Sequence, residues 1–166
     1  ILRRHERRRG DDQHLRAGAA GMPAQTVGIV SDAPPPPKLA VNYETVLSWP
    51  QFDAWLARIE AAELTALDTE TTSLDSFEAR IVGISLSVTP GEACYIPLAH
   101  TAPGVAEQLP RDEVLARLKP WLGAVDRKKV LQNAKYDQHV FANHGIALAG
   151  IAHDTMLQSY VLESDK

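Results

Sequence analysis

Leu67-Asp68-Thr69-Glu70-Thr71-Thr72-Ser73-Leu74 is the stretch that decides how this chain folds. It continues an apolar run that begins at Leu64, and such a run predicts a buried strand. Because side chains alternate between the two faces of a strand, Asp68 and Glu70 should point the same way at its C-terminal end. Carboxylates this close repel each other unless a cation lies between them, and divalent cations prefer carboxylate oxygens. The stretch therefore indicates a metal site, with two solvated acids at a strand end as the alternative interpretation.

The composition is that of an ordinary globular protein, with 45% hydrophobic and 23% charged residues among 166. This length leaves room for one domain with a core. The single cysteine, Cys94, cannot form an intramolecular disulfide, which fits a reducing cytosol. No apolar run approaches the roughly 18 residues of a membrane-spanning helix, and the basic N-terminus has no apolar segment behind it. Neither a membrane protein nor a secretory signal is expected.

Charge and proline content divide the chain near residue 40. Residues 1–40 carry 7 Lys/Arg against 4 Asp/Glu and end in the four prolines Pro34–Pro37, whereas residues 41–166 carry 10 against 17. We predict a flexible Arg/Pro-rich linker over residues 1–40 and a folded domain over residues 41–166. An acidic domain lacks the basic surface that is typical of nucleic-acid binding proteins. Metal-dependent nucleases can still be acidic, because bound cations neutralise their carboxylates. The net charge alone therefore does not decide whether this domain binds nucleic acid.

Hydrophobic periodicity predicts alternating strands and helices after residue 39. The strands are expected over residues 39–46, 64–70, 81–88, 93–98, 129–132 and 151–153. The helices are expected after Ser48, around Val114–Leu122, over residues 134–144, and over residues 155–162 behind a cap at Asp154.

The predicted fold class is α/β, because three strands in succession are followed by β-α units in the order βββ-α-β-α-β-α. This order implies a mixed sheet in which the strand at 64–70 is central and the later strands are parallel to it. Sites in open sheets of this kind form at the carboxyl ends of the central strands, where Asp68 and Glu70 are expected.

Asp137 is the candidate for a third acidic residue of the site. It comes just after the predicted strand at 129–132, near the start of a helix. If that strand neighbours the one at 64–70, Asp137 lies beside its end. Asn133 either caps the helix with its side chain or directs its amide at a phosphate or sugar.

Two short motifs resemble those of a known enzyme family. Asp68-Thr69-Glu70-Thr71 resembles the first motif of DEDD-type 3′–5′ exonucleases, and Asn133-x-x-Tyr136-Asp137 resembles their second motif, N-x-x-(F/Y)-D. The surrounding sequence is similar to the proofreading exonuclease domain of bacterial DNA polymerase I over about residues 40–164. The segments that carry this likeness are Leu67–Leu74, Tyr95–His100, Gln132–Asp137 and Asp154–Leu157.

The resemblance implies a ribonuclease H-like fold and hydrolysis of the 3′-terminal phosphodiester with two divalent metal ions, Mg²⁺ or Mn²⁺. By the family pattern, Asp68 bridges both ions and Glu70 holds the ion that activates the attacking water. Asp137 serves the second ion. These three residues are therefore expected to be both catalytic and metal-binding.

The resemblance also implies a substrate and partners. Thr71 and Leu74 would pack on the terminal nucleotide of a single-stranded DNA 3′ end, and Asn133 would contact the strand nearby; Leu74 as an ordinary turn residue is the alternative. An apolar residue against the last base suits any sequence. The expected partner is the polymerase domain of a parent chain that serves DNA replication and repair, in the cytoplasm of a bacterium and associated with the nucleoid.

The family's third motif, Y-x-x-x-D or H-x-x-x-x-D, is not found in the 166 residues. Tyr160 is followed four residues later by Ser164, and we interpret this tyrosine as a core residue of the last helix. The chain is expected to be a partial exonuclease domain that folds poorly or in part. It should have little or no activity alone, because the missing carboxylate and tyrosine would act on the water-activating metal.

Three alternatives stay open. One is a ribonuclease D-like enzyme that trims RNA, although residues 95–100 and the proline-rich segment favour the polymerase family. Another is a non-catalytic spacer domain of a polymerase, against which the presence of Asp68, Glu70 and Asp137 argues. The last is a gene fragment without a function of its own.

Overall fold

The structure is a computed structural model, which describes residues 40–163. Its strands are β1 (Asn42–Thr45), β2 (Leu64–Thr71), β3 (Ile81–Thr89), β4 (Glu92–Pro97), β5 (Lys128–Leu131) and β6 (Ile151–Asp154). Its helices are α1 (Trp49–Ala61), α2 (Arg111–Gly123), α3 (Ala134–Ala142) and α4 (Thr155–Glu163). The linker predicted over residues 1–40 lies, apart from Ala40, outside the described residues.

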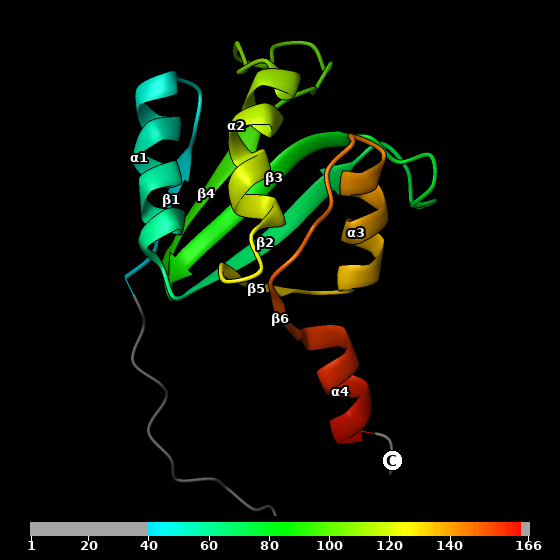
Figure 1. Ribbon diagram of the computed structural model, residues 1–166. Coiled ribbons are helices and arrows are strands. Elements are labelled where there is room, and N and C mark those ends of the chain that lie inside the picture. Colours follow the sequence, from blue (N-terminus) through cyan, green and yellow to red (C-terminus); the bar gives the residue numbers. More distant parts are fainter. Residues whose placement is uncertain (1–39, 164–166) are drawn as a thin grey trace, which may run out of the picture. The chain divides into compact units, whose positions relative to one another are not determined.

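All six strands belong to one mixed sheet in the order β1-β4-β3-β2-β5-β6 (Figure 1). Strands β2, β3 and β4 form an antiparallel meander. Strand β5 pairs in parallel with β2, β6 pairs in parallel with β5, and β1 joins β4 in parallel at the opposite edge. The predicted mixed sheet, with β2 central and the later strands parallel to it, is confirmed.

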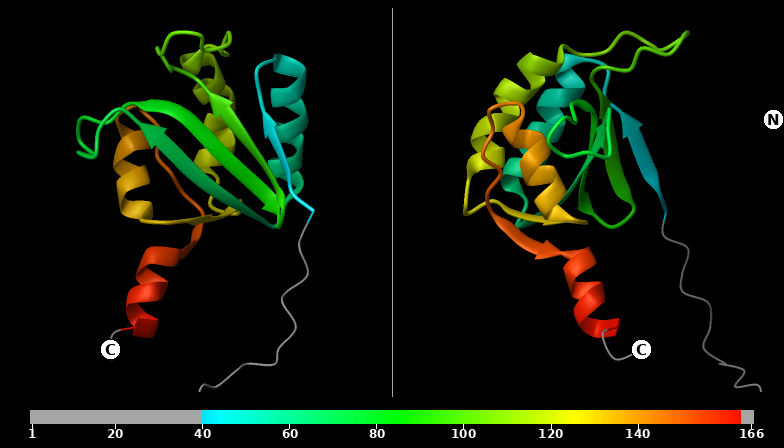
Figure 2. Two further views of the ribbon diagram at one scale, coloured as in Figure 1. Left: turned by 180° about the vertical axis from the view of Figure 1, so that it is seen from behind. Right: turned by 90° about the vertical axis from the view of Figure 1, so that its right-hand side faces the viewer.

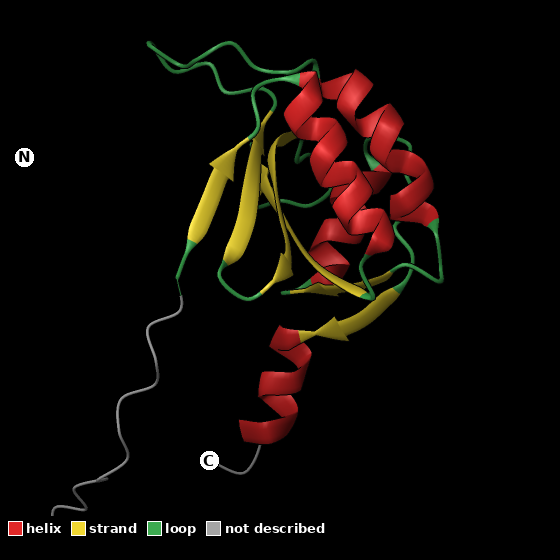
Figure 3. Ribbon diagram, turned by 90° about the vertical axis from the view of Figure 1, so that its left-hand side faces the viewer, coloured by secondary structure: helices red, strands yellow, loops and turns green. Residues whose placement is uncertain are grey.

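Helices α1, α2 and α3 cover the same face of the sheet (Figures 2 and 3). The alternation along β2 shows which face this is, because Thr65 and Leu67 are buried whereas Ala66 and Asp68 are exposed. The opposite face, which we call the open face, carries no helix among residues 40–163 in these views. Asp68 therefore projects from the open face of a sheet whose other face forms the core.

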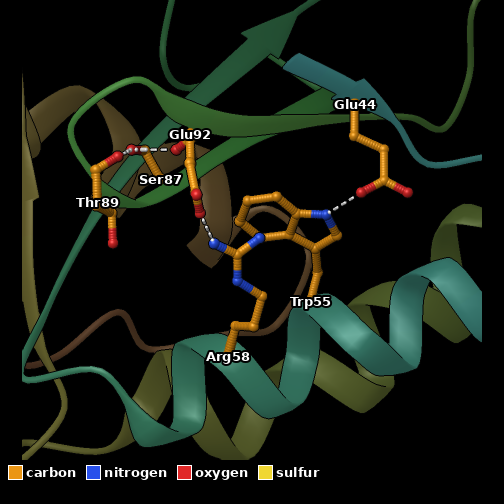
Figure 4. Close-up of polar contacts among 6 residues, drawn as sticks. All are labelled: Glu44, Trp55, Arg58, Ser87, Thr89 and Glu92. Atoms are coloured by element: carbon orange, nitrogen blue, oxygen red, sulfur yellow. Dashed lines mark hydrogen bonds and ion pairs between the residues drawn. The ribbon is translucent and has the colours of Figure 1, made fainter. Parts of the chain in front are cut away.

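Helix α1 is held at the β1–β4 edge by contacts around Trp55 (Figure 4). The indole Nε1 donates a hydrogen bond to Glu44 of β1 at 2.8 Å. One turn later, Arg58 pairs with Glu92 at the start of β4 and lies 4.1 Å from the centroid of the Trp55 ring. Because the ion pair is partly exposed, it adds little to stability, and burial of the indole contributes more.

Helix α4 extends beyond the end of β6, apart from the other three helices (Figure 1). Tyr160 is 68% exposed and Leu162 is 82% exposed. The interpretation of Tyr160 as a core residue is therefore wrong, because α4 continues past the edge of the sheet and does not cover the helical layer. No helix within residues 40–163 is long and apolar enough to cross a bilayer.

His144 joins the residues after α3 to the start of β3. Its Nε2 accepts a hydrogen bond from the backbone N–H of Ile81 at 3.1 Å, so the ring acts as an acceptor. Burial, together with the nearby positive charges of Arg80 and Arg111, lowers the pKa of His144 to about 4. Between that pH and the ordinary histidine pKa of about 6.5, the unfolded chain binds a proton that the folded chain excludes. The stability that neutral His144 contributes is therefore present at pH 7 and is lost as the pH falls.

The variant His144→Gln tests this pH dependence, since glutamine keeps an acceptor for Ile81 but does not titrate. We expect the free energy of unfolding of the native protein to fall more between pH 7 and pH 5 than that of the variant. Urea unfolding at both pH values measures the difference. Equal losses in the two proteins would show that His144 does not titrate with unfolding.

Candidate active site

Strand β2 carries Asp68 and Glu70 on the open face of the sheet, as predicted, and both residues are exposed. Their partners on β3 are Ser85 and Gly83, so small residues border the carboxylates on that side. Asp68 also lines a hollow of about 340 Å³ on this face, whose walls include residues of β3, β4 and β5. A ligand can approach both carboxylates from solvent.

Asp137 lies in the first turn of α3, at the same end of β2 but on its other side. Its side chain is buried, and its Oδ1 accepts a hydrogen bond from Thr69 Oγ1 at 2.6 Å. Thr69 stands between Asp68 and Glu70 in the strand, so alternation turns its side chain to the opposite face. The fold thus brings Asp68, Glu70 and Asp137 to the C-terminal end of β2. Asp68 and Glu70 come from its open face, and Asp137 comes from the opposite face.

The three carboxylates are close but do not share one coordination sphere. Within residues 40–163, no three His, Cys, Asp or Glu side chains are gathered as a ready metal site. In the same part of the chain, none of the ion pairs includes Asp68, Glu70 or Asp137. Their negative charge is therefore not neutralised by a described lysine or arginine, which suits a site for a divalent cation.

Burial raises the pKa of Asp137 to about 6. The hydrogen bond from Thr69 opposes this rise, whereas the negative charges of Asp68 and Asp154 add to it. A cation held beside this carboxylate would lower its pKa and displace the proton. Metal binding at this position should therefore release a proton at pH values near or below 6.

The variant Thr69→Val removes the hydroxyl that donates to Asp137 and keeps a similar shape. Because this hydrogen bond favours the ionised carboxylate, we expect the pKa of Asp137 to rise above its native value. NMR titration of the Asp137 side-chain carbon without metal measures the change. An unchanged or lower pKa would contradict the role given to Thr69.

A second surface hollow, of about 390 Å³, lies at the end of β2 and includes Glu70 in its lining. It is lined by residues 69–74 and by Tyr136 of α3. The Tyr136 hydroxyl lies 2.5 Å from Thr71 Oγ1 and donates a hydrogen bond to the carbonyl oxygen of Ser73 at 2.6 Å. Leu74 is 98% exposed and also lines this hollow. Thr71 and Leu74 thus share one hollow with Glu70, and Tyr136 fixes its wall.

Asn133 occupies the N-cap position of α3, but it does not cap the helix. Its backbone is left-handed, with φ 62° and ψ 53°, and its side chain makes no cap hydrogen bond. The interpretation of Asn133 as a side-chain cap is therefore wrong, because an acceptor from elsewhere in the chain reaches the start of this helix. A contact between its amide and the substrate stays a prediction.

Tyr95 and His100 form a pair on the open face that sequence reasoning did not assign to the site. The Tyr95 hydroxyl lies 2.5 Å from His100 Nε2. The tyrosine ring lies over Gly83, where an added Cβ would come within 2.0 Å of the hydroxyl. Because Gly83 is the strand partner of Glu70, the pair stands next to that carboxylate. Burial and the charge of Glu70 both raise the pKa of Tyr95.

The motif spacing could have indicated one of the missed residues. Tyr136 is part of the N-x-x-Y-D motif, and its place before Asp137 puts it at the start of α3. Tyr95 reaches Gly83 through the pairing of β4 with β3, and Gly83 pairs with Glu70 on β2, so this proximity depends on contacts between strands.

Comparisons with a family model and with known proteins point to the same protein family. Residues 43–166 match the family described as 3′–5′ exonuclease. DNA polymerase I of Pseudomonas aeruginosa is 52% identical over 143 residues, which are 85% of this chain and 16% of that relative. The chain thus spans about a sixth of the length of this relative.

Solved structures share the fold. The POL domain of Pol1 from M. smegmatis, in complex with DNA primer-template and dNTP, aligns with a TM-score of 0.57 and 23% identity, over 74% of this chain and 20% of that chain. Trypanosoma brucei RNase D aligns with a TM-score of 0.51 and 14% identity, over 66% of this chain and 36% of that chain. The expected ribonuclease H-like fold is confirmed.

Proposed function

Because this chain belongs to the 3′–5′ exonuclease domain family of DNA polymerase I, we propose that it removes nucleotides from single-stranded 3′ ends of DNA as the proofreading part of such a polymerase. The observation that carries the proposal is the meeting of Asp68, Glu70 and Asp137 at the end of β2, without a described cationic side chain to neutralise them. A divalent cation is the partner that this donor set fits.

The proposed cofactors are two divalent cations, Mg²⁺ or Mn²⁺. When bound, such ions lower the pKa of an attacking water and stabilise the leaving 3′ oxygen. Asp68 would contact both ions, and Glu70, which shares the open face with Asp68, would hold one of them. The Asp137 carboxylate accepts a hydrogen bond from Thr69, and in this proposal it would turn toward Asp68 when the second ion binds.

The terminal nucleotide would lie in the hollow formed by residues 69–74 and Tyr136. Glu70 lines this hollow, so a nucleotide in it would bring its phosphate close to the proposed cations. Leu74 is an exposed apolar side chain that can stack on the last base without reading its sequence. Thr71 and Asn133 would position the strand through polar contacts.

Two alternatives differ in the observations that support them. A ribonuclease D-like activity has the shared fold behind it, at 14% identity, whereas the likeness to DNA polymerase I reaches 52% identity. A non-catalytic spacer would not need the acidic residues that are present. As part of a bacterial polymerase, the domain would act in the cytoplasm at the nucleoid, on primer ends handed over by the polymerase domain.

The test uses the purified polymerase I-type protein that carries this chain, with single-stranded DNA labelled at the 5′ end and an RNA of the same sequence. We expect stepwise shortening of the DNA from its 3′ end with Mg²⁺ or Mn²⁺, and none with a chelator. Preferential shortening of the RNA would favour the ribonuclease D-like alternative. No shortening and no specific Mn²⁺ binding would favour the spacer. The prediction that the 166 residues alone have little activity is tested by the same assay.

A further inference from the structure

Asp154, the last residue of β6, accepts hydrogen bonds from the backbone N–H groups of two separate helices. Its Oδ1 accepts from Met156 at 3.0 Å and from Leu157 at 3.3 Å, in the first turn of α4. Its Oδ1 also accepts from Asn133 at 3.1 Å, and its Oδ2 from Ala134 at 2.8 Å, at the start of α3. One carboxylate thus serves both helix starts.

Helix α3 depends on this outside acceptor. The first N–H groups of a helix have no partner within it, and Asn133 does not supply one with its own side chain. Asp154 pairs two of these groups and brings a negative charge to the positive end of the helix. Burial opposes the charge, but the four backbone N–H groups outweigh it and lower the pKa of Asp154.

The sheet fixes the place of this carboxylate. Asp154 of β6 is the register partner of Leu131 of β5, which is followed two residues later by Asn133. The link between Asp154 and the start of α3 therefore spans two adjacent parallel strands at the end where the acidic residues meet. Asp137 lies in the first turn of that helix.

We propose that Asp154 is a positioning residue of the exonuclease site, which holds Asn133 and Asp137 in place through the start of α3. This inference rests on the proposed function. Without the link, the left-handed turn at Asn133 and the first helical turn would lose the acceptors that define their position, and the Asp137 carboxylate would move relative to Asp68. Residues that orient metal ligands from outside commonly change metal affinity or activity by about 10- to 100-fold when replaced.

The two helix contacts of Asp154 can be separated by mutation. Serine at this position keeps an oxygen for the N–H groups of α4, as a short N-cap residue does, but does not reach α3. Asparagine keeps an oxygen in the place of Oδ1 and loses the acceptor for Ala134. Asp154→Ser should therefore remove the link to α3, and Asp154→Asn should restore part of it.

A matched control comes from the start of α1, away from the acidic residues. Ser48 donates its backbone N–H to Gln51 Oε1 at 3.1 Å, and its hydroxyl lies 2.9 Å from the same oxygen. Ser48→Ala weakens this helix start without touching the site. It shows how much a general loss of helix capping changes each measurement.

The experiment measures kcat, KM and Mn²⁺ affinity for the polymerase I-type protein that carries the chain, at a temperature where all variants are folded. For Asp154→Ser we expect kcat and Mn²⁺ affinity to fall by about 10- to 100-fold, with Asp154→Asn in between and Ser48→Ala unchanged. Native kcat and Mn²⁺ affinity in Asp154→Ser would overturn the inference while leaving the proposed function intact. A native protein that neither binds Mn²⁺ nor shortens DNA would overturn both.

Discussion

Asp68→Ala is expected to lower the rate of 3′-end hydrolysis by about 10²–10⁴-fold, the scale of losing one group that acts in the transition state. Asp68 shares the open face with Glu70, and Asp137 lies on the other side of β2, bonded to Thr69. In the proposed site Asp68 contacts both cations, so its removal should weaken the binding of both. Because Asp68 is exposed, the free energy of unfolding should stay within about 0.5 kcal/mol of the native value.

The measurement is single-turnover shortening of labelled single-stranded DNA by the polymerase I-type protein, with primer extension by the same preparation as an internal check. Extension should be unaffected. Glu60→Ala, which removes an exposed carboxylate from α1, is the matched control for charge and should be fully active. Hydrolysis by Asp68→Ala at a rate within about threefold of native, which corresponds to about 0.7 kcal/mol of activation free energy, would contradict the site assignment.

Asp137→Asn is expected to abolish cleavage and at the same time to stabilise the metal-free protein at neutral pH. The pKa of Asp137 is about 6 in the folded chain, whereas an unperturbed aspartate has a pKa of about 3.9. Across this window the unfolded chain has released the proton and the folded chain still holds it. Stability from this group therefore falls as the pH rises from about 4 to 6 and stays low above.

Asparagine avoids the free-energy cost of burying an ionised carboxylate because it cannot ionise. Its Oδ1 still accepts the hydrogen bond from Thr69. At pH 7.5 with a chelator, we expect the variant to be more stable than the native protein by about 1–3 kcal/mol, from roughly 1.4 kcal/mol per pKa unit. Urea unfolding at pH 4 and pH 7.5 measures this, and the difference should vanish at the lower pH. A variant that is less stable at pH 7.5, or a difference independent of pH, would contradict the prediction.

The order of strands and helices could be predicted because local patterns specify it. The alternation along β2, the turn at Thr89–Glu92 and the helical spacing in α1 each depend on neighbours in sequence. The exposure of Tyr160 could not be predicted in the same way. Helical spacing shows which residues share a face, and it does not show whether another element covers that face.

Local patterns also predicted part of the candidate site. Alternation alone places Asp68 and Glu70 on one face, and strand order brings Asp137 to their end of the sheet. The contact of Asp137 with Thr69 depends on how α3 packs. The cap of α3 by Asp154 was missed because the acceptor comes from a residue that is far away in sequence.

The central claim is that Asp68, Glu70 and Asp137 together bind divalent cations. A crystal of the polymerase I-type protein soaked in Mn²⁺, with an anomalous difference map, tests this most directly. We expect one Mn²⁺ peak between Asp68 and Glu70 and another between Asp68 and Asp137, with the Asp137 carboxylate turned away from Thr69. A map without density at these carboxylates, in crystals that still shorten DNA, would contradict the claim.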